Sequence, residues 1–317
     1  MQRILPRGEI EGLDHTRIPR LRMPERAGVF SDRAARLRSL AGSSPIGDYL
    51  GLMARLADAQ QRALKEFTPP EPDPARVEQA REHNMPPLQP ASAPRDAPAW
   101  RALLGRLLDD VLSGEGLPDA AAKTCTGLLQ KLGASPGEVE DIADALLSSG
   151  YDSVEVDAAA APFVMAALQV YWTAMAAAFD QAKVPSGPFG VCPLCGTPPV
   201  ASVVRIGGSY DGYRYLCCPL CSVETHLVRV TCSYCSETKG IAYHYVENGP
   251  EGVKPEAIKA ETCENCRSYR KIFYQEKDLY VEPVADDLAS VGLDVLMGEE
   301  GYTRSSGNPL LWQGRED

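Results

Sequence analysis

Apolar positions in the first 180 residues recur every three or four residues, which is the period of an amphipathic helix. This pattern predicts helices over residues 31–41, 46–67, 99–112, 117–132, 136–149 and 158–181. Proline-rich stretches at 68–74 and 85–98 cannot continue a helix, so they predict loops. Ser31 is the expected N-cap of the first helix, and residues 1–30, rich in Pro and Arg, are expected to form an extended arm.

The period changes after a Pro/Gly linker at residues 183–190, which marks a domain boundary. Beyond it, β-rich runs separated by Gly-rich turns predict strands over 200–206, 213–217, 225–230, 241–246 and 271–274. A helix over 284–300 and a loop over 301–317 follow. The predicted architecture is α+β and multidomain, with a helical domain (1–185), two small modules (186–230 and 231–283) and a C-terminal helix and tail (284–317).

One helical stretch resembles a membrane span in length. Residues 158–179 carry no charge and lie between Asp157 and Asp180. Ten of these 22 residues are Ala, however, and no Lys/Arg cluster marks a flank. The stretch is therefore predicted to be the buried central helix of the helical domain.

The cysteines carry the strongest chemical signal in the chain. Eight of the ten form Cys-x-x-Cys pairs, which are Cys192/Cys195, Cys218/Cys221, Cys232/Cys235 and Cys263/Cys266. A tight turn with two residues between thiolates directs both sulfurs at one ion, and two such turns complete a tetrahedral site. The sequence therefore predicts two metal sites, and four thiolates leave no open coordination position for catalysis.

The spacing of the pairs favours sequential grouping. Spacers of 22 and 27 residues, long enough for a hairpin, follow the first and third pairs, whereas ten residues separate the second pair from the third. One ion is thus expected at Cys192, Cys195, Cys218 and Cys221, and another at Cys232, Cys235, Cys263 and Cys266. An interleaved cross-brace is the alternative. Modules of this size bury too little core to fold alone, so the ions are expected to be structural.

The identity of the metal stays open, because iron and zinc both accept four thiolates. The string Cys192-Pro-Leu-Cys-Gly196 has the form of a rubredoxin knuckle, and zinc ribbons use the same turn. His226 and His244 are interpreted as sheet residues rather than ligands. Cys217 is the spare beside Cys218, and Cys125 is expected to pack inside a helix.

Charge restricts the possible partners. The net charge is −11, and residues 186–317 carry 12 Lys/Arg against 18 Asp/Glu, which argues against a zinc-ribbon nucleic-acid binder. The first 40 residues are the exception, with nine Arg against five acids. This region is expected either to be solvated or to dock on an acidic partner. The paired cysteines favour a reducing compartment, and residues 1–12 lack the apolar segment of a signal peptide, so a cytoplasmic location is predicted.

No catalytic constellation stands out. The sequence has no Gly-x-Gly-x-x-Gly fingerprint after a strand, no phosphate-binding loop and no nucleophile elbow. Asp286 and Asp287 are expected on an acidic helix face rather than as an acid/base pair. No catalytic residue and no organic cofactor site is predicted, so the chain is not expected to be an enzyme.

The chain resembles the FdhE family of formate dehydrogenase accessory proteins over almost its whole length. The strings that carry the resemblance are Cys192-Pro-Leu-Cys-Gly, Tyr213-Arg-Tyr-Leu, Val228-Arg-Val, Cys232-Ser-Tyr-Cys, Lys259-Ala-Glu-Thr-Cys263, Lys271-Ile-Phe-Tyr-Gln-Glu-Lys277, Val284-Ala-Asp-Asp-Leu-Ala289 and Glu300-Gly-Tyr-Thr-Arg-Ser-Ser306. In the N-terminal half, Arg33-Ala-Ala-Arg-Leu-Arg-Ser-Leu40, Gly47-Asp-Tyr-Leu50 and Ala161-Pro-Phe163 also fit.

That resemblance implies a helical domain followed by two rubredoxin-like modules that bind iron through their cysteine pairs. It also implies a cytoplasmic role in forming active formate dehydrogenase, through association with the molybdenum-containing catalytic subunit. An alternative hypothesis is an iron–tetrathiolate (FeS4) electron carrier that acts on the active site of a partner enzyme.

Overall fold

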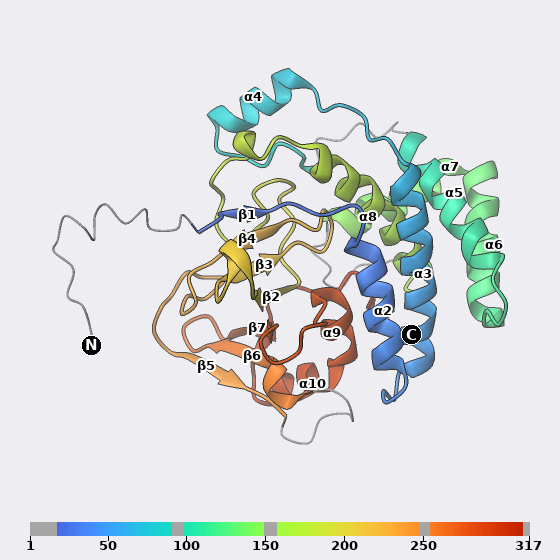
Figure 1. Ribbon diagram of the computed structural model, residues 1–317. Coiled ribbons are helices and arrows are strands. Elements are labelled where there is room, and N and C mark those ends of the chain that lie inside the picture. Colours follow the sequence, from blue (N-terminus) through green and yellow to red (C-terminus); the bar gives the residue numbers. More distant parts are fainter. Residues whose placement is uncertain (1–17, 91–97, 149–156, 247–253, 313–317) are drawn as a thin grey trace, which may run out of the picture.

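The structure is a computed structural model that describes residues 18–90, 98–148, 157–246 and 254–312. The predicted arm therefore lies largely outside the described residues, as do parts of the 85–98 loop and of the tail. Helices gather on one side of the molecule and a sheet with two short helices on the other (Figure 1). This mixed helical and sheet architecture confirms the predicted fold class. The boundaries at 185, 230 and 283 stay predictions.

The N-terminal half is helical, as the apolar periodicity predicts. Its helices are α2 (Val29–Ala41), α3 (Gly47–Glu66), α4 (Pro74–Glu82), α5 (Pro98–Leu112), α6 (Asp119–Ala134), α7 (Pro136–Ser148) and α8 (Ala161–Ala178). Helix α4 was not expected, because it buries no side chain and so has no apolar period to detect. Its start follows local rules instead: Asp73 accepts a hydrogen bond from the Ala75 amide, and Pro74 occupies the first position.

The predicted cap at Ser31 is wrong. Helix α2 begins at Val29, with Gly28 as its N-cap, and the Ser31 hydroxyl donates to the Gly28 carbonyl from inside the helix. The free amides at this helix end are bound from α3 instead: Gln61 Oε1 accepts from the amides of Phe30 and Ser31, at 3.1 and 3.0 Å.

Helix α8 is the centre of the helical part. Fifteen of its residues are buried, on every side of the helix. Among the described residues it is the one helix long and apolar enough to cross a membrane, and 83% of that apolar window is buried inside the protein. The stretch is therefore a core helix, as its alanine content and lack of flanking charge predict.

The C-terminal half and one short strand near the start of the chain form one mixed sheet. Its strands are β1 (Leu21–Arg22), β2 (Ala201–Val204), β3 (Arg214–Cys217), β4 (Glu224–His226), β5 (Ile241–His244), β6 (Ile258–Cys263), β7 (Ser268–Tyr274) and β8 (Thr303–Arg304). Their order is β1-β4-β3-β2-β7-β6-β5, with β8 beside β7. The two predicted modules meet where β2 and β7 pair in parallel, and the remaining pairs along this order are antiparallel.

Three strands escaped prediction, and several predicted strands are too long, most of all the one over 225–230. Strand β6 reads Ile-Lys-Ala-Glu-Thr-Cys, in which Lys, Ala and Glu have weak β propensity. Strands β1 and β8 have two residues each, too few for a period. The strand expected over 225–230 ends at His226, and Val228 and Val230 are exposed beyond it.

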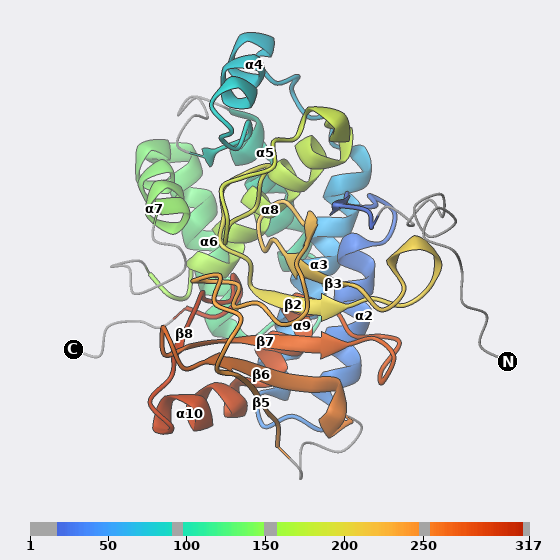
Figure 2. The ribbon, with the colours of Figure 1, turned by 90° about the vertical axis from the view of Figure 1, so that its left-hand side faces the viewer.

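The C-terminal helix predicted over 284–300 is two short helices, α9 (Pro283–Ala289) and α10 (Val291–Glu299). Ser290 separates them, and its hydroxyl donates to the Asp286 carbonyl at 2.6 Å. The Ser290 amide donates to the same carbonyl at 3.1 Å, so the side chain and the backbone together close the last turn of α9. Figure 2 shows α10 beside the β5–β6 end of the sheet.

The expected acidic face at Asp286 and Asp287 is also wrong, because both side chains are buried. Arg36 of α2 binds Asp286 at 2.5 Å, and Arg304 and Lys271 bind Asp287. Removing one partner of a buried pair typically costs about 3–5 kcal/mol. The arginine-rich region at the start of the chain therefore belongs in part to the fold: its charges fasten α2 to α9.

Candidate metal centres

The structure gathers the eight paired cysteines into two groups. Centre 1 is Cys192, Cys195, Cys218 and Cys221, and centre 2 is Cys232, Cys235, Cys263 and Cys266. Within each group, all four sulfurs lie within 4.8 Å of one another. This is the sequential grouping that the spacer lengths favour, and not the cross-brace. The strands explain it: the β2–β3 hairpin returns the chain to the first knuckle, and β5–β6 does the same for the third.

The size of both groups fits a tetrahedral ion. Cys192 and Cys221 sulfurs are 3.5 Å apart and Cys195 and Cys218 sulfurs 3.4 Å apart, whereas the equivalent distances in centre 2 are both 3.7 Å. Metal–sulfur bonds of about 2.3 Å in a tetrahedron place the sulfurs about 3.8 Å apart. Bonded disulfide sulfurs are about 2.05 Å apart, and all the cysteines are free thiols. The groups can hold one ion each, iron or zinc.

All four knuckles share one backbone turn. The residue after the second cysteine of each pair has a positive φ: Gly196 at 79°, Ser222 at 60°, Ser236 at 61° and Arg267 at 53°. This left-handed residue reverses the chain, and in three knuckles the amide at that position donates to the carbonyl of the first cysteine. Only Gly196 adopts this conformation without a steric cost. The steric cost at Ser222, Ser236 and Arg267 is consistent with turns that are held in place by the contacts among the sulfurs of each centre.

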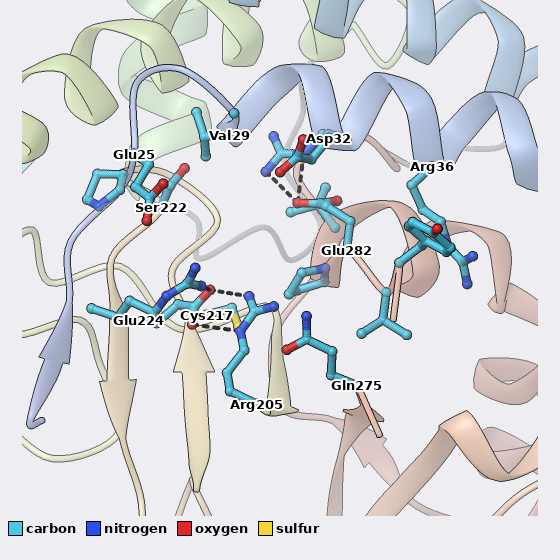
Figure 3. A pocket seen from close by; sticks show the side chains of 18 of the residues that line it. Glu25, Val29, Asp32, Arg36, Arg205, Cys217, Ser222, Glu224, Gln275 and Glu282 are labelled. Carbon is cyan, nitrogen blue, oxygen red and sulfur yellow. Dashed lines mark hydrogen bonds and ion pairs between the residues drawn. The ribbon is translucent and has the colours of Figure 1, made fainter. Parts of the chain in front are cut away.

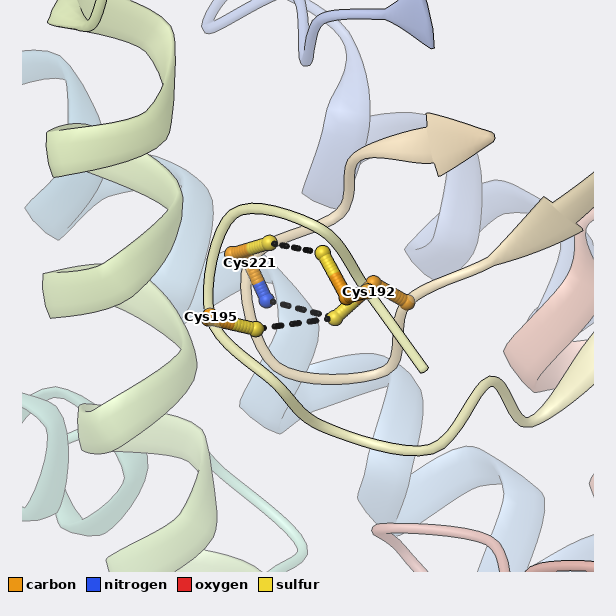
Figure 4. Close-up of side chains that lie close together, drawn as sticks. Cys192, Cys195 and Cys221 are labelled. Atoms are coloured by element: carbon orange, nitrogen blue, oxygen red, sulfur yellow. Dashed lines mark hydrogen bonds between the residues drawn. The ribbon is translucent and has the colours of Figure 1, made fainter. Parts of the chain in front are cut away.

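Centre 1 is enclosed between the sheet and the helices. Its four cysteines are each at most 4% exposed, and the leucines at its knuckle tips, Leu194 and Leu220, are fully buried. Helix α8 contacts the second tip directly, because Gln169 donates to the Pro219 carbonyl at 2.7 Å. Figure 4 shows the two knuckles facing each other beside a helix. Centre 1 therefore joins the two halves of the molecule.

The first knuckle is held by the loop that precedes α5. The Leu88 amide donates to the Leu194 carbonyl at 2.8 Å, and Trp172 of α8 donates to the Leu88 carbonyl at 2.9 Å. The proline-rich stretch interpreted as a surface linker thus supplies part of the shell of centre 1.

Centre 2 lies at the protein surface. Cys235 and Cys266 are half-buried, and Tyr234 at the tip of the third knuckle is 62% exposed. Polar groups surround its sulfurs: the Ser268 hydroxyl lies 3.0 Å from Cys266 Sγ, and the Asn265 amide donates to Cys235 Sγ at 3.6 Å. Solvent and small reagents can approach two of its ligands.

Hydrogen bonds prepare one thiol in each centre for metal binding. Burial raises the pKa of Cys195, but hydrogen bonds with the other three thiols and with Thr197 outweigh it and hold that pKa well below its usual range. At Cys235, burial also raises the pKa, and hydrogen bonds from the Glu237 amide and Asn265 bring it to about 7. Because a metal binds the thiolate, a low thiol pKa reduces the cost of losing the proton.

The residues set aside as non-ligands stand apart from both groups. His226 lies in β4 against the rings of Tyr213 and Tyr215. His244 lies in β5, and its Nε2 is 3.0 Å from the Thr262 hydroxyl. Cys125 is fully buried in α6, where burial raises its pKa to about 11. Both histidines are sheet residues, and Cys125 packs in the core.

Cys217 borders a cavity of about 690 Å³ between α2, the β3–β4 strands and residues 275–284 (Figure 3). It points away from centre 1 because neighbouring residues of a strand alternate in direction. Burial, and then the charge of Glu224, raise the pKa of Cys217 well above its usual range. Glu224 itself is paired with Arg205 and Arg22. Cys217 is therefore a protonated thiol at the edge of this cleft.

Sequence reasoning missed the difference between the two centres, although the knuckles contain a signal for it. Both knuckles of centre 1 read Cys-Pro-Leu-Cys, whereas those of centre 2 read Cys-Ser-Tyr-Cys and Cys-Glu-Asn-Cys. Apolar tips require burial and polar tips tolerate solvent.

Comparison with known proteins adds the family. Models of the FdhE N-terminal region, the FdhE central domain and the FdhE C-terminal domain match residues 18–187, 191–229 and 230–311. A protein FdhE homolog of Cronobacter sakazakii is 42% identical over 318 residues, covering 98% of each chain. Protein FdhE of Salmonella typhimurium is 41% identical over the same share.

A solved structure agrees. The crystal structure of the FdhE protein from Pseudomonas aeruginosa superimposes with a TM-score of 0.79 at 38% sequence identity, covering 94% of this chain and all of that one. The three family models cover almost all of the described residues, the relatives are more than 40% identical, and the fold is shared. The chain therefore belongs to the FdhE family.

Proposed function

We propose that this protein is an accessory factor needed to form active formate dehydrogenase, and that it binds the molybdenum-containing catalytic subunit during maturation. The observation that carries the proposal is the full-length similarity to proteins named FdhE, at 42% identity over 98% of the chain. The link to formate dehydrogenase rests on what the family resemblance implies.

The protein is proposed to assist an enzyme rather than to be one. Within the described residues, the metal-ligand groups are the two four-cysteine centres, and each already offers a complete tetrahedral set. In the cavity beside α2, Arg205 is paired with Glu224 and Arg33 with Glu282, although the buried Arg33 Nη1 has no hydrogen-bond partner among the described residues. The purified protein is therefore expected to show no formate oxidation.

A cytoplasmic location is part of the proposal. Thiolate centres and free cysteines are stable in a reducing compartment, where disulfides are rare. Iron is the favoured metal because the family resemblance implies it, and the sulfur distances suit zinc equally.

The alternative function is an FeS4 electron carrier that acts on the active site of the partner. The half-buried Cys235 and Cys266 favour this role for centre 2, because electron transfer needs close approach of the partner to the sulfurs. The fully enclosed centre 1 does not favour it.

The test is an affinity pull-down from cells that express formate dehydrogenase. It compares the wild type with the Cys232→Ser/Cys235→Ser variant and, as a matched cysteine control, with Cys125→Ala, which removes a buried thiol outside both centres. Capture of the catalytic subunit by the wild type and the control supports the accessory role. Loss of capture in the double variant would assign recognition to centre 2.

Failure of the wild type to capture the catalytic subunit would contradict the proposed partner. If all three proteins capture it but only the double variant fails to yield active enzyme, centre 2 acts after binding, and the electron-carrier role gains support.

A further inference from the structure

Strand β7 presents alternate residues to centre 2. Ser268 and Arg270 are two positions apart, so their side chains leave the same face of the strand. The Ser268 hydroxyl contacts Cys266 Sγ directly at 3.0 Å. The Arg270 Nε donates at 2.7 Å to the hydroxyl of Ser233, which lies inside the Cys232–Cys235 knuckle. One strand therefore supports both knuckles of the centre.

Arg270 is buried, at 3% exposure, yet among the described residues no carboxylate lies within ion-pair distance of it. Its two hydrogen bonds inside the protein go to hydroxyl groups, those of Ser233 and Ser306. A guanidinium stays charged in proteins, and a buried charge without an opposite charge costs several kcal/mol. An anion close to Arg270 is required to offset that cost.

The other buried cations in this region have such an anion. Arg214 forms two hydrogen bonds with Glu261, at 2.7 and 2.9 Å, and Lys271 is 2.7 Å from an Asp294 oxygen. Burial, and then the neighbouring charges of Arg214 and Arg304, lower the pKa of Arg270 to about 9, whereas Cys232 and Glu261, the partner of Arg214, act in the opposite direction. The sulfurs of centre 2 are thus the negative group that faces Arg270 without a cation of its own.

Arg270 and two cysteines of centre 2 also line the same narrow cavity. Its lining includes Cys232 and Cys263 of the centre, Arg270 and Ser305. The Ser305 hydroxyl is buried and has no hydrogen-bond partner among the described residues. Across this cavity the field of Arg270 reaches the thiolates through protein rather than through bulk water, which strengthens the interaction.

We propose that Arg270 is the charge partner and positioning residue of centre 2: its guanidinium offsets the negative charge of the metal–tetrathiolate and holds the Cys232–Cys235 knuckle through Ser233. Four thiolates around a divalent ion leave a net negative charge. Arg270 therefore favours metal binding at this centre, and with iron bound it favours the reduced, more negative state. For centre 1, no buried arginine without a carboxylate partner lies beside the sulfurs in the described part of the chain.

The test is cadmium NMR of the full-length protein loaded with cadmium, which gives a separate signal for each centre, during titration with a chelator. Arg270→Met should weaken cadmium binding at centre 2 by about 10–100-fold, as for other groups that support metal ligands, and leave centre 1 unchanged. Arg270→Lys keeps the charge and should recover most of the loss. Ser233→Ala keeps Arg270 and should cause a smaller loss than Arg270→Met.

The matched control is Arg267→Met. Arg267 directly follows the ligand Cys266 in the sequence, but it is exposed and paired with Glu264. Its replacement should change cadmium affinity less than about twofold, because the field of an exposed charge is screened by solvent. An equal loss in the Arg267 and Arg270 variants would contradict the proposal, as would a centre 2 affinity in Arg270→Met that equals the wild type.

A purely structural role predicts a different outcome, in which Arg270→Lys weakens cadmium binding at centre 2 as much as Arg270→Met does. Should Arg270→Met fail to fold, Arg270→Lys decides: near-wild-type affinity at centre 2 supports the charge role, and a loss as large as a cysteine substitution overturns it. With iron bound, Arg270→Met should also lower the midpoint potential of centre 2, by about 59 mV for each tenfold change in the preference for the reduced state.

Discussion

Centres 1 and 2 have the same ligands, the same turn and nearly the same sulfur distances, yet different surroundings. Leu194 and Leu220 at the tips of centre 1 are fully buried, whereas Tyr234 at a tip of centre 2 is 62% exposed. The chain thus uses one motif in two ways: centre 1 fastens the helices to the sheet, and centre 2 faces solvent beside a buried arginine.

The difference arises from what packs on the knuckles. Gln169 and Thr173, one turn apart on α8, reach the carbonyls of Pro219 and Leu220 at centre 1. At centre 2, the knuckles lie against β7 and residues 300–303, and Cys235, Cys266 and Tyr234 are partly or largely exposed. A metal bound at centre 1 therefore stabilises contacts between two halves of the molecule, and a metal at centre 2 stabilises one end of the sheet.

The largest expected effect comes from removing ligands. Cys192→Ser/Cys195→Ser should lower the thermal stability of the whole protein, helices included, because structural sites of this kind contribute about 10–16 kcal/mol of apparent binding free energy. Cys232→Ser/Cys235→Ser should release one metal ion and unfold the region around centre 2 while the helical domain stays folded. Metal content, with thermal unfolding followed by circular dichroism, measures both.

The comparison fails if the two double variants lose the same helical signal at the same temperature. Retention of both metal ions after substitution of Cys232 and Cys235 would contradict the grouping of the ligands itself.

A smaller effect is expected from the knuckle tips. Leu220→Ala should destabilise the protein by about 2–5 kcal/mol, the usual cost of truncating a fully buried leucine. Tyr234→Ala, at the matching tip of centre 2, should change the free energy of unfolding by less than about 0.5 kcal/mol, because its side chain is exposed. Urea unfolding of the metal-loaded proteins provides the measurement, and similar losses in both variants would count against the difference in burial.

Much of this organisation can be predicted from the sequence. Helical periodicity located α2, α3 and α5–α8, because each buries an apolar face, and the lengths of the cysteine spacers indicated which pairs meet. Helix α4 and strand β6 lack those signals: α4 buries nothing, and β6 contains residues with weak β propensity.

Long-range ion pairs could not be predicted. Asp286 is bound by Arg36, 250 residues earlier in the chain, and no local pattern distinguishes such an aspartate from one on a solvated face. The same holds for Arg270, whose nearest partners are Ser233 and Ser306. From the sequence alone, charged residues are predicted to lie at the surface, because the partners beside which they are buried are distant along the chain.

The smallest expected effect concerns single hydrogen bonds at each centre. Thr173→Val removes a hydroxyl that lies 3.2 Å from the Ser222 hydroxyl and 3.4 Å from the Leu220 carbonyl, and should cost about 1 kcal/mol of stability. Asn265→Ala removes the exposed amide that donates to Cys235 and should leave stability within about 0.5 kcal/mol of the wild type. A larger loss of stability in Asn265→Ala than in Thr173→Val, measured by the same urea unfolding, would contradict the assignment of centre 1 as the more tightly packed centre.

The most direct test of the unequal roles is metal retention by the wild-type protein after brief exposure to a chelator, measured by native mass spectrometry. Because two ligands of centre 2 are half-buried and all four of centre 1 are enclosed, one metal ion should leave quickly and one should remain, with the helical signal preserved. Loss of both ions at one rate, or prior loss from centre 1, would contradict the account.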